Sequence, residues 1–188
     1  RDLVLVMTVV FFTTTFGLNF QIFIALMSTK EFGLGPSEFG TLGTILAVGS
    51  LSGALVAARL EKHRTIRNIL RGAILFGVLV AASAYLPNVY IYAAMLPLLG
   101  ATVLLTLISA NTYVQSNTDS ALRGRVMGIY LMIFMGGTPI GSPLIGLVAS
   151  AIGIRATILI CGLIVLSAAL ILRSVFRESV TSAIPESR

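Results

Sequence analysis

The chain has 188 residues, of which 56% are hydrophobic and only 11% are charged, and its formal net charge is +6 at pH 7. Soluble globular domains carry roughly 25% charged residues, so this chain has too few to cover a water-facing surface. The composition excludes a basic soluble domain with a nucleic-acid partner and predicts an all-α integral membrane protein, with the lipid bilayer as its surroundings.

The first residues are Arg1 and Asp2, and an apolar run follows at once. This start has none of the features of a signal peptide, so we expect the chain to be a piece of a longer protein. Its single cysteine, Cys161, excludes an internal disulfide and a multi-cysteine metal site, and we expect no metal ion and no cofactor. Cys161 lies within an apolar run and is expected to be a small buried apolar residue.

The charged residues fall in short clusters that are separated by long apolar runs. The run from Gly72 to Thr118 holds no charge at all, and Pro87-Asn88 divides it at a typical turn. A membrane helix needs about 20 apolar residues, which each run provides, in part with help from its flanks. We therefore predict one domain over residues 1–172 with six transmembrane helices, over 3–27, 38–58, 69–86, 89–112, 126–152 and 155–173, and a tail over 174–188.

Lys and Arg are distributed unequally between the two ends of these helices. With the N-terminus inside, eleven of the thirteen lie on the cytoplasmic side, and only Lys30 and Arg155 lie outside. Cytoplasmic loops carry an excess of Lys and Arg, so both termini of this segment and its tail are expected in the cytoplasm. The basic loop over 59–71 could also bind anionic lipid, although topology alone explains it.

Polar side chains form a stripe on the first span. Thr8, Thr15 and Asn19 are seven and four residues apart, which puts them on one face of a helix. We predict that this face, together with Gln21, lines a wet substrate pathway, with hydrogen bonding between helices as the alternative for the threonines. Asn19 is the strongest candidate because a buried carboxamide must find polar partners.

A pattern of small residues occurs in both the second and the fifth spans. The second span contains GSLSGALVAA from Gly49, and the fifth contains GSPLIGLVAS from Gly141. The two spans run in opposite directions, as corresponding helices of a nested 3+3 inverted repeat do. The similarity predicts such a repeat.

A second polar stripe lies on the fourth span, where Thr102, Thr106 and Ser109 are four and three residues apart. These spacings again give one helix face. We predict that it lines the same pathway, and hydrogen bonding between helices is again the alternative.

Gly and Pro are concentrated in the fifth span, in the sequence GGTPIGSPLIG over residues 136–146. Gly137 and Gly141 lie on one face and allow the backbone of a neighbouring helix to approach, while Pro139 and Pro143 bend the helix. This predicts a moving interface at which Gly141→Ala is partly tolerated, with a static packing groove as the alternative. The residues predicted for packing and gating are Gly49, Gly53, Gly137, Pro139, Gly141, Pro143 and Gly146.

Ionisable residues are absent from the depth of every predicted span. Such groups are the usual proton relays of pumps, so any proton carrier is expected elsewhere in the protein. The single histidine, His63, lies in a loop, which disfavours an intramembrane serine protease, and no potassium-channel filter sequence occurs. We expect no enzymatic activity.

Two regions together carry a resemblance to a known family. The segment LRGRVMG from Leu122, followed by GGTPIGSPLIG, resembles the tenth-to-eleventh helix region of the major facilitator superfamily. Asn19-Phe20-Gln21 and the glycines of the second span resemble its seventh and eighth helices, most closely in the bacterial enterobactin-exporter and drug-efflux branch. The resemblance covers essentially the whole chain and implies the C-terminal six-helix half of a twelve-helix facilitator fold.

The family implies a secondary active transporter of the bacterial cytoplasmic membrane that exports a small amphipathic substrate, such as a drug or a siderophore, by alternating access. Its partner would be the N-terminal six-helix half of the same protein, which would also carry the coupling to protons. The first and fourth spans would line the cavity, and the glycines at 128, 137, 141 and 146 approximate the antiporter motif, which favours export. A non-transporting membrane receptor or scaffold on the same fold is the alternative.

A cytoplasmic loop motif of the family maps onto the region from Gly53 to Arg64. Here Ala58 replaces its Asp and Glu61 its Gly, while the positive positions are kept. The cytoplasmic basic residues that the resemblance singles out are Arg59, Lys62, Arg64, Arg123 and Arg125.

Overall fold

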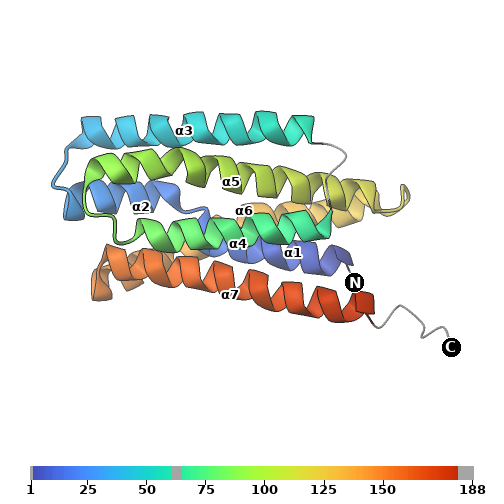
Figure 1. The fold of residues 1–188 in the computed structure, drawn as a ribbon. Coiled ribbons are helices and arrows are strands. Elements are labelled where there is room, and N and C mark those ends of the chain that lie inside the picture. Colours follow the sequence, from blue (N-terminus) through green and yellow to red (C-terminus); the bar gives the residue numbers. More distant parts are fainter. Residues whose placement is uncertain (1, 61–64, 182–188) are drawn as a thin grey trace.

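The computed structural model describes residues 2–60 and 65–181, with side chains as far as Phe176, and every regular element in these ranges is helical. Six stretches are long and apolar enough to cross a membrane, which confirms the six expected spans. In chain order the elements of Figure 1, with π-helical turns written η, are α1 (Asp2–Phe12), η1 (Thr13–Gly17), α2 (Phe20–Leu26), η2 (Met27–Glu31), α3 (Pro36–Arg59), α4 (Ile66–Ser83), α5 (Val89–Ser116), α6 (Arg123–Ile152) and α7 (Ile154–Thr181).

Local signals explain where several of these helices begin and end. Thr65 Oγ1 and Asn88 Oδ1 accept hydrogen bonds from backbone N–H groups in the first turns of α4 and α5, as N-cap side chains do. Gly153 has a φ of 85°, a left-handed conformation that favours glycine and allows the sharp turn from α6 into α7. At its other end α7 continues to Thr181, so the expected tail over 174–188 begins as helix.

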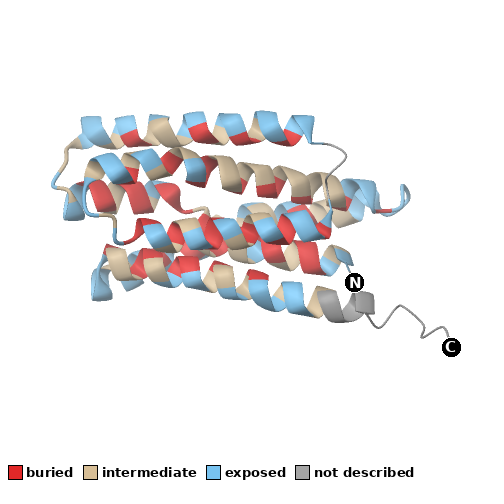
Figure 2. Ribbon diagram, in the orientation of Figure 1, coloured by how far each residue is buried: buried red, intermediate tan, exposed pale blue. Residues whose placement is uncertain are grey.

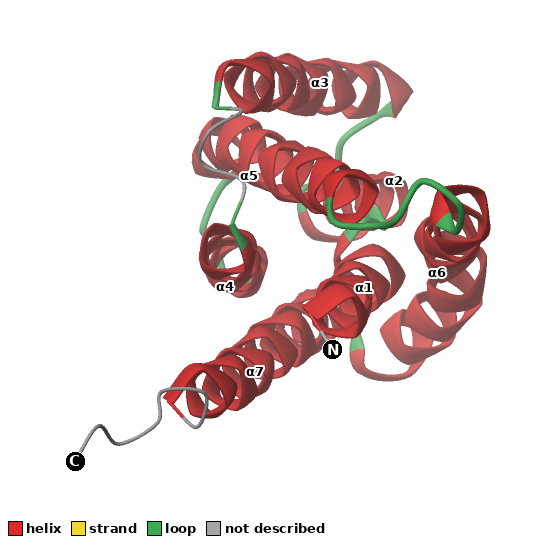
Figure 3. Cartoon of the chain, turned by 90° about the vertical axis from the view of Figure 1, so that its right-hand side faces the viewer, coloured by secondary structure: helices red, strands yellow, loops and turns green. Residues whose placement is uncertain are grey.

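The six spans pack around a continuous apolar core. Viewed along the helix axes, α3 lies on α5, α4 packs against both α5 and α7, and the first span lies between α6 and α7 (Figure 3). Buried residues gather on the facing sides of the first span, α4 and α5, whereas α3 and α6 are the least buried spans (Figure 2). The exposed surfaces of α3 and α6 are apolar, as lipid or further protein requires.

Glycines mark the closest helix crossings. A Cβ atom built on Gly49 or Gly53 of α3 would overlap the backbone of α5 at Pro97 and Ala101. The predicted packing role of these two glycines therefore corresponds to a real contact. Between α4 and α7 each helix contributes a glycine. A Cβ atom on Gly77 of α4 would overlap the backbone at Leu166, and one on Gly162 of α7 would overlap the backbone at Ala81. Small residues allow such close approach, which contributes much of the attraction between helices in lipid.

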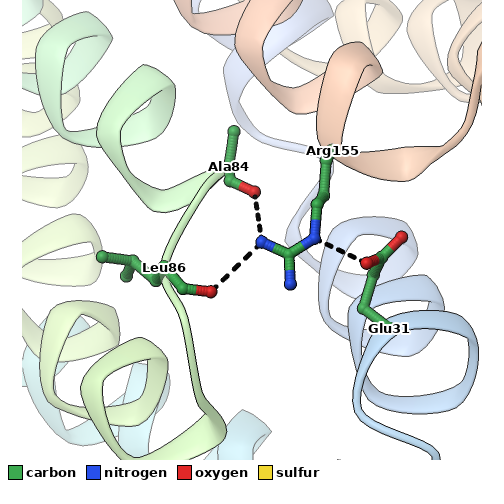
Figure 4. Close-up of polar contacts among 4 residues, drawn as sticks. All are labelled: Glu31, Ala84, Leu86 and Arg155. Carbon is green, nitrogen blue, oxygen red and sulfur yellow. Dashed lines mark hydrogen bonds and ion pairs between the residues drawn. The ribbon is translucent and has the colours of Figure 1, made fainter.

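Arg155 joins three segments at one end of the bundle. Its Nε donates to Glu31 Oε2 at 2.5 Å, and its Nη1 donates to the carbonyl oxygens of Ala84 and Leu86 at 3.2 and 3.1 Å (Figure 4). The planar guanidinium suits this set of divergent acceptors better than the ammonium of lysine. The start of α7, the end of η2 and the α4–α5 connection are thereby tied together.

We expect Arg155→Ala to lower the free energy of unfolding of the full-length protein by about 2 kcal/mol, because it removes a partly buried ion pair and two charge-assisted hydrogen bonds. Arg155→Lys keeps the charge without the fork and should recover only part of this loss. Thermal unfolding in detergent measures the effect, and hydrogen exchange of residues 84–88 locates it. Unchanged exchange in both variants would show that the connection is held by other contacts.

Candidate functional site

The first span is interrupted, although the sequence predicts one helix over 3–27. The α-helix widens at η1, where Leu18 N donates to Thr13 O at 3.0 Å, and Leu18 and Asn19 are not helical. Three consecutive threonines and Gly17 precede the interruption. β-Branched residues and glycine lower helix propensity, and the Thr14 hydroxyl competes for backbone by bonding to Val10 O at 2.9 Å. We call this interrupted segment, residues 13–19, the break.

Asn19 satisfies the backbone on both sides of the break. Its backbone carbonyl oxygen accepts hydrogen bonds from the N–H groups of Ile22 and Phe23, both at 3.1 Å, and these bonds start α2. Its Nδ2 donates to Thr15 O at 2.8 Å, and its Oδ1 accepts from Ser142 Oγ of α6, also at 2.8 Å. Asn19 is only 3% exposed, and both the nitrogen and the oxygen of its side-chain amide bond to protein in this conformation.

The glycines of α6 pack directly on η1. A Cβ atom on Gly137 would overlap Thr14, and one on Gly141 would overlap the carbonyl oxygen of Thr15. The fifth span therefore does provide a flat face, as the sequence predicts, and that face meets the break of the first span. The interruption itself lies in the partner helix, because α6 continues as one helix through Pro139 and Pro143.

Two buried hydroxyl groups of η1, Thr13 Oγ1 and Thr15 Oγ1, have no hydrogen-bond partner among the described residues. Each side chain is 1% exposed. Leaving a buried hydroxyl group unsatisfied typically costs about 1–3 kcal/mol.

The two predicted polar stripes face different neighbours. Thr106 of α5 lies against Gly72 of α4, whereas Thr15 and Asn19 lie against α6. Thr102, Thr106 and Ser109 all line a cavity of about 410 Å³ between α3, α4 and α5. The structure therefore does not bring the second stripe to the break, because the stripe lines the cavity between α3, α4 and α5 instead.

A smaller cavity of about 200 Å³ lies beside the break and opens between α5 and α6. We call it the break cavity. Its wall combines Leu18 with Tyr130 and Phe134, whose rings stack with centroids 6.2 Å apart. Its polar groups are the Asn111 amide and the Tyr130 hydroxyl, which donates to Leu107 O at 3.3 Å. An apolar, aromatic wall with few polar groups is typical of small-molecule sites.

Asn111, Tyr130 and Phe134 are missing from the sequence-based candidates. Asn111 is an amide near one end of the fourth span, and Tyr130 and Phe134 are one helical turn apart, just before Gly137. The sequence held this signal, but aromatic residues at helical spacing are as common in ordinary cores as in binding sites.

The remaining predicted residues lie apart from the break. Thr8 bonds back to Val4 O, Gln21 is exposed, and a Cβ on Gly146 would have no atom within 4 Å, so Gly146 is not part of the close contact. Lys62 and Arg64 lie outside the described residues. The other predicted residues are exposed. Arg59, Arg123 and Arg125 lie at or near helix ends, and Pro139 and Pro143 lie on the surface of α6.

Comparison with known proteins identifies the family. The family model described as transmembrane secretion effector matches residues 2–187. The chain is 30% identical over 125 residues to the multidrug efflux pump Tap of Mycolicibacterium fortuitum, which covers 66% of the chain and 31% of that protein. It is 28% identical over 149 residues to the staphyloferrin A transporter of Staphylococcus aureus, covering 78% of the chain and 37% of that protein.

Six apolar spans that pack through close glycine contacts define a membrane protein with several membrane-spanning helices. The chain belongs to the transmembrane secretion effector family of the major facilitator superfamily, a family of transporters and not of enzymes. This confirms the resemblance drawn from its sequence. The matched regions span about a third of the length of these two relatives.

Proposed function

We propose that the chain is the C-terminal six-helix half of an exporter that moves a small amphipathic compound by alternating access. The observation that carries this proposal is the break in the first span, held against α6 by Asn19 and Ser142. In secondary transporters, substrate sites lie near the bilayer midplane and are formed by discontinuous helices at the interface of the repeats. The break cavity, apolar with few polar groups, supports an amphipathic substrate, and the names of the two relatives point to drugs or siderophores.

We infer that the half is built as a nested inverted repeat in which the first three spans exchange with the last three. Two packing features support this inference. The contact of α3 on α5 corresponds to that of α6 on η1, and each uses two glycines four residues apart on the first-named helix. The crossing of α4 and α7 corresponds to itself, since its glycine contacts are reciprocal.

Export is tested with the full-length protein in cells that lack their own efflux pumps. Expression should lower the accumulation of an amphipathic dye or a siderophore, and a protonophore should abolish the effect because we propose proton coupling through the rest of the protein. Export that survives the protonophore but requires sodium would mean that the coupling ion is sodium and not the proton. Saturable binding without any flux would favour a receptor or scaffold.

We propose that both termini of this segment are cytoplasmic, because eleven of the thirteen Lys and Arg lie on that side. Reporter fusions should therefore report the cytoplasm after Lys62, Arg123 and Arg177, and the outside after Glu31, Asn88 and Gly153. The reverse pattern would invert the orientation, and a cytoplasmic signal at Asn88 alone would contradict the separate third and fourth spans.

A further inference from the structure

The larger cavity, between α3, α4 and α5, has no role in the proposed export path. On α5 its lining residues Thr102, Thr106 and Ser109 lie on the face opposite to Leu104, Ile108 and Asn111, which line the break cavity, because successive residues turn by about 100°. It also opens elsewhere: α3 and α4 both pack on α5 but make little contact with each other (Figure 3). We call it the α4 cavity.

The α4 cavity is polar at one end and apolar along its depth. Arg71 and Asn68 lie at the end near the start of α4, one or two turns after Thr65. Deeper, the wall is formed by apolar side chains and the hydroxyls of the second stripe, which are Val56, Leu75, Ala101, Leu105, Thr102 and Thr106. Each hydroxyl of the stripe donates to a carbonyl oxygen four residues earlier, so none of these three hydroxyls is a free donor for a ligand. The wall therefore suits an aliphatic chain.

Arg71 is positioned to receive an anion. Among the described residues it makes no ion pair with an acidic residue, and its side chain makes one hydrogen bond, a long one of 3.5 Å to Asn68 Oδ1. Asp2 lines a neighbouring surface cavity that Arg71 shares, but Arg67 lies there too, so positive charge prevails at this end. Guanidinium groups bind phosphate in a bidentate manner, which makes arginine the usual residue for this task.

We propose that the α4 cavity binds an anionic phospholipid, with the phosphate on Arg71 and one acyl chain between α3 and α4. The volume of about 410 Å³ lies within the range of small-molecule sites. The site lies at the end of the bundle that carries most Lys and Arg, where anionic headgroups are attracted. It does not depend on export or on its direction, so failure of either proposal leaves the other standing.

The test measures lipid binding to the purified full-length protein by native mass spectrometry, with dioleoylphosphatidylglycerol and dioleoylphosphatidylcholine as probes. The first phosphatidylglycerol should bind more tightly than phosphatidylcholine, and Arg71→Gln should weaken it about tenfold because a charge-assisted contact is lost. Arg71→Lys keeps the charge but not the bidentate geometry and should therefore recover only part of the affinity. Ser109→Leu fills the cavity without changing the charge and should weaken binding as well.

Arg173→Gln is the matched control, since it removes one exposed arginine from the same end of the bundle without touching the cavity. Equal losses in Arg71→Gln and Arg173→Gln, with no effect of Ser109→Leu, would reduce the effect to general surface charge and overturn the site. Equal binding of the two lipids would remove the role of charge. Competition by glycerol 3-phosphate as effective as that by the phospholipid would remove the role of the acyl chain.

Discussion

Gly141→Ala should nearly abolish transport by the full-length protein while leaving much of it in the membrane. The added methyl group would overlap the backbone oxygen of Thr15, which lies in η1 and cannot rotate away as a side chain does. Overpacking typically costs about 1–3 kcal/mol, and a shift of about 1.4 kcal/mol already changes the ratio of two conformations tenfold. Efflux rate and membrane abundance, measured in parallel, separate the two effects.

Gly146→Ala is the matched control, because it makes the same change on the same helix where no atom lies within 4 Å. It should leave transport unchanged. The sequence alone suggested that alanine at Gly141 would be partly tolerated, because the spacing showed a close approach but not what approached. If Gly141→Ala transports as well as Gly146→Ala, α6 and the first span do not touch here in the working cycle.

The number of spans and the packing face of α6 follow from the sequence because both are properties of one helix. Apolar length sets the spans, and the four-residue spacing of Gly137 and Gly141 sets the face. The partner of that face depends on how the helices assemble, which one helix does not encode. For the same reason the stripe at Thr102 was predictable as a stripe, but its direction toward α4 was not.

The break was not predicted from the sequence, for a different reason. Proline is the strongest local signal against a regular helix, so the sequence predicted a bend at Pro139 and Pro143. Yet α6 tolerates both prolines as a continuous helix, while TTTFGLN gives way. Neither β-branching nor one glycine is enough to break a membrane helix by itself. The break is stabilised because Asn19 Nδ2 donates to Thr15 O, while Asn19 Oδ1 accepts a bond from Ser142, 123 residues away in sequence.

Asn19→Leu removes both side-chain bonds and leaves Thr15 O and the Ser142 hydroxyl without their partner, at about 1–3 kcal/mol each, so transport and membrane abundance should both fall. Ser142→Ala removes only the bond between the first span and α6. Abundance should then stay near normal, while the population of separated helices rises and the transport rate changes.

Ser150→Ala serves as the control on α6, because the Ser150 hydroxyl bonds only to Leu147 O within its own helix. Accessibility of a cysteine placed at Leu18 reports whether the break opens to water. In Ser142→Ala that accessibility should increase several-fold over the Ser150→Ala control, since a weakened contact of about 1 kcal/mol changes such an equilibrium by about fivefold. Equal accessibility and transport in the two variants would mean that α6 and the break stay together throughout the cycle, and the moving interface would have to lie elsewhere.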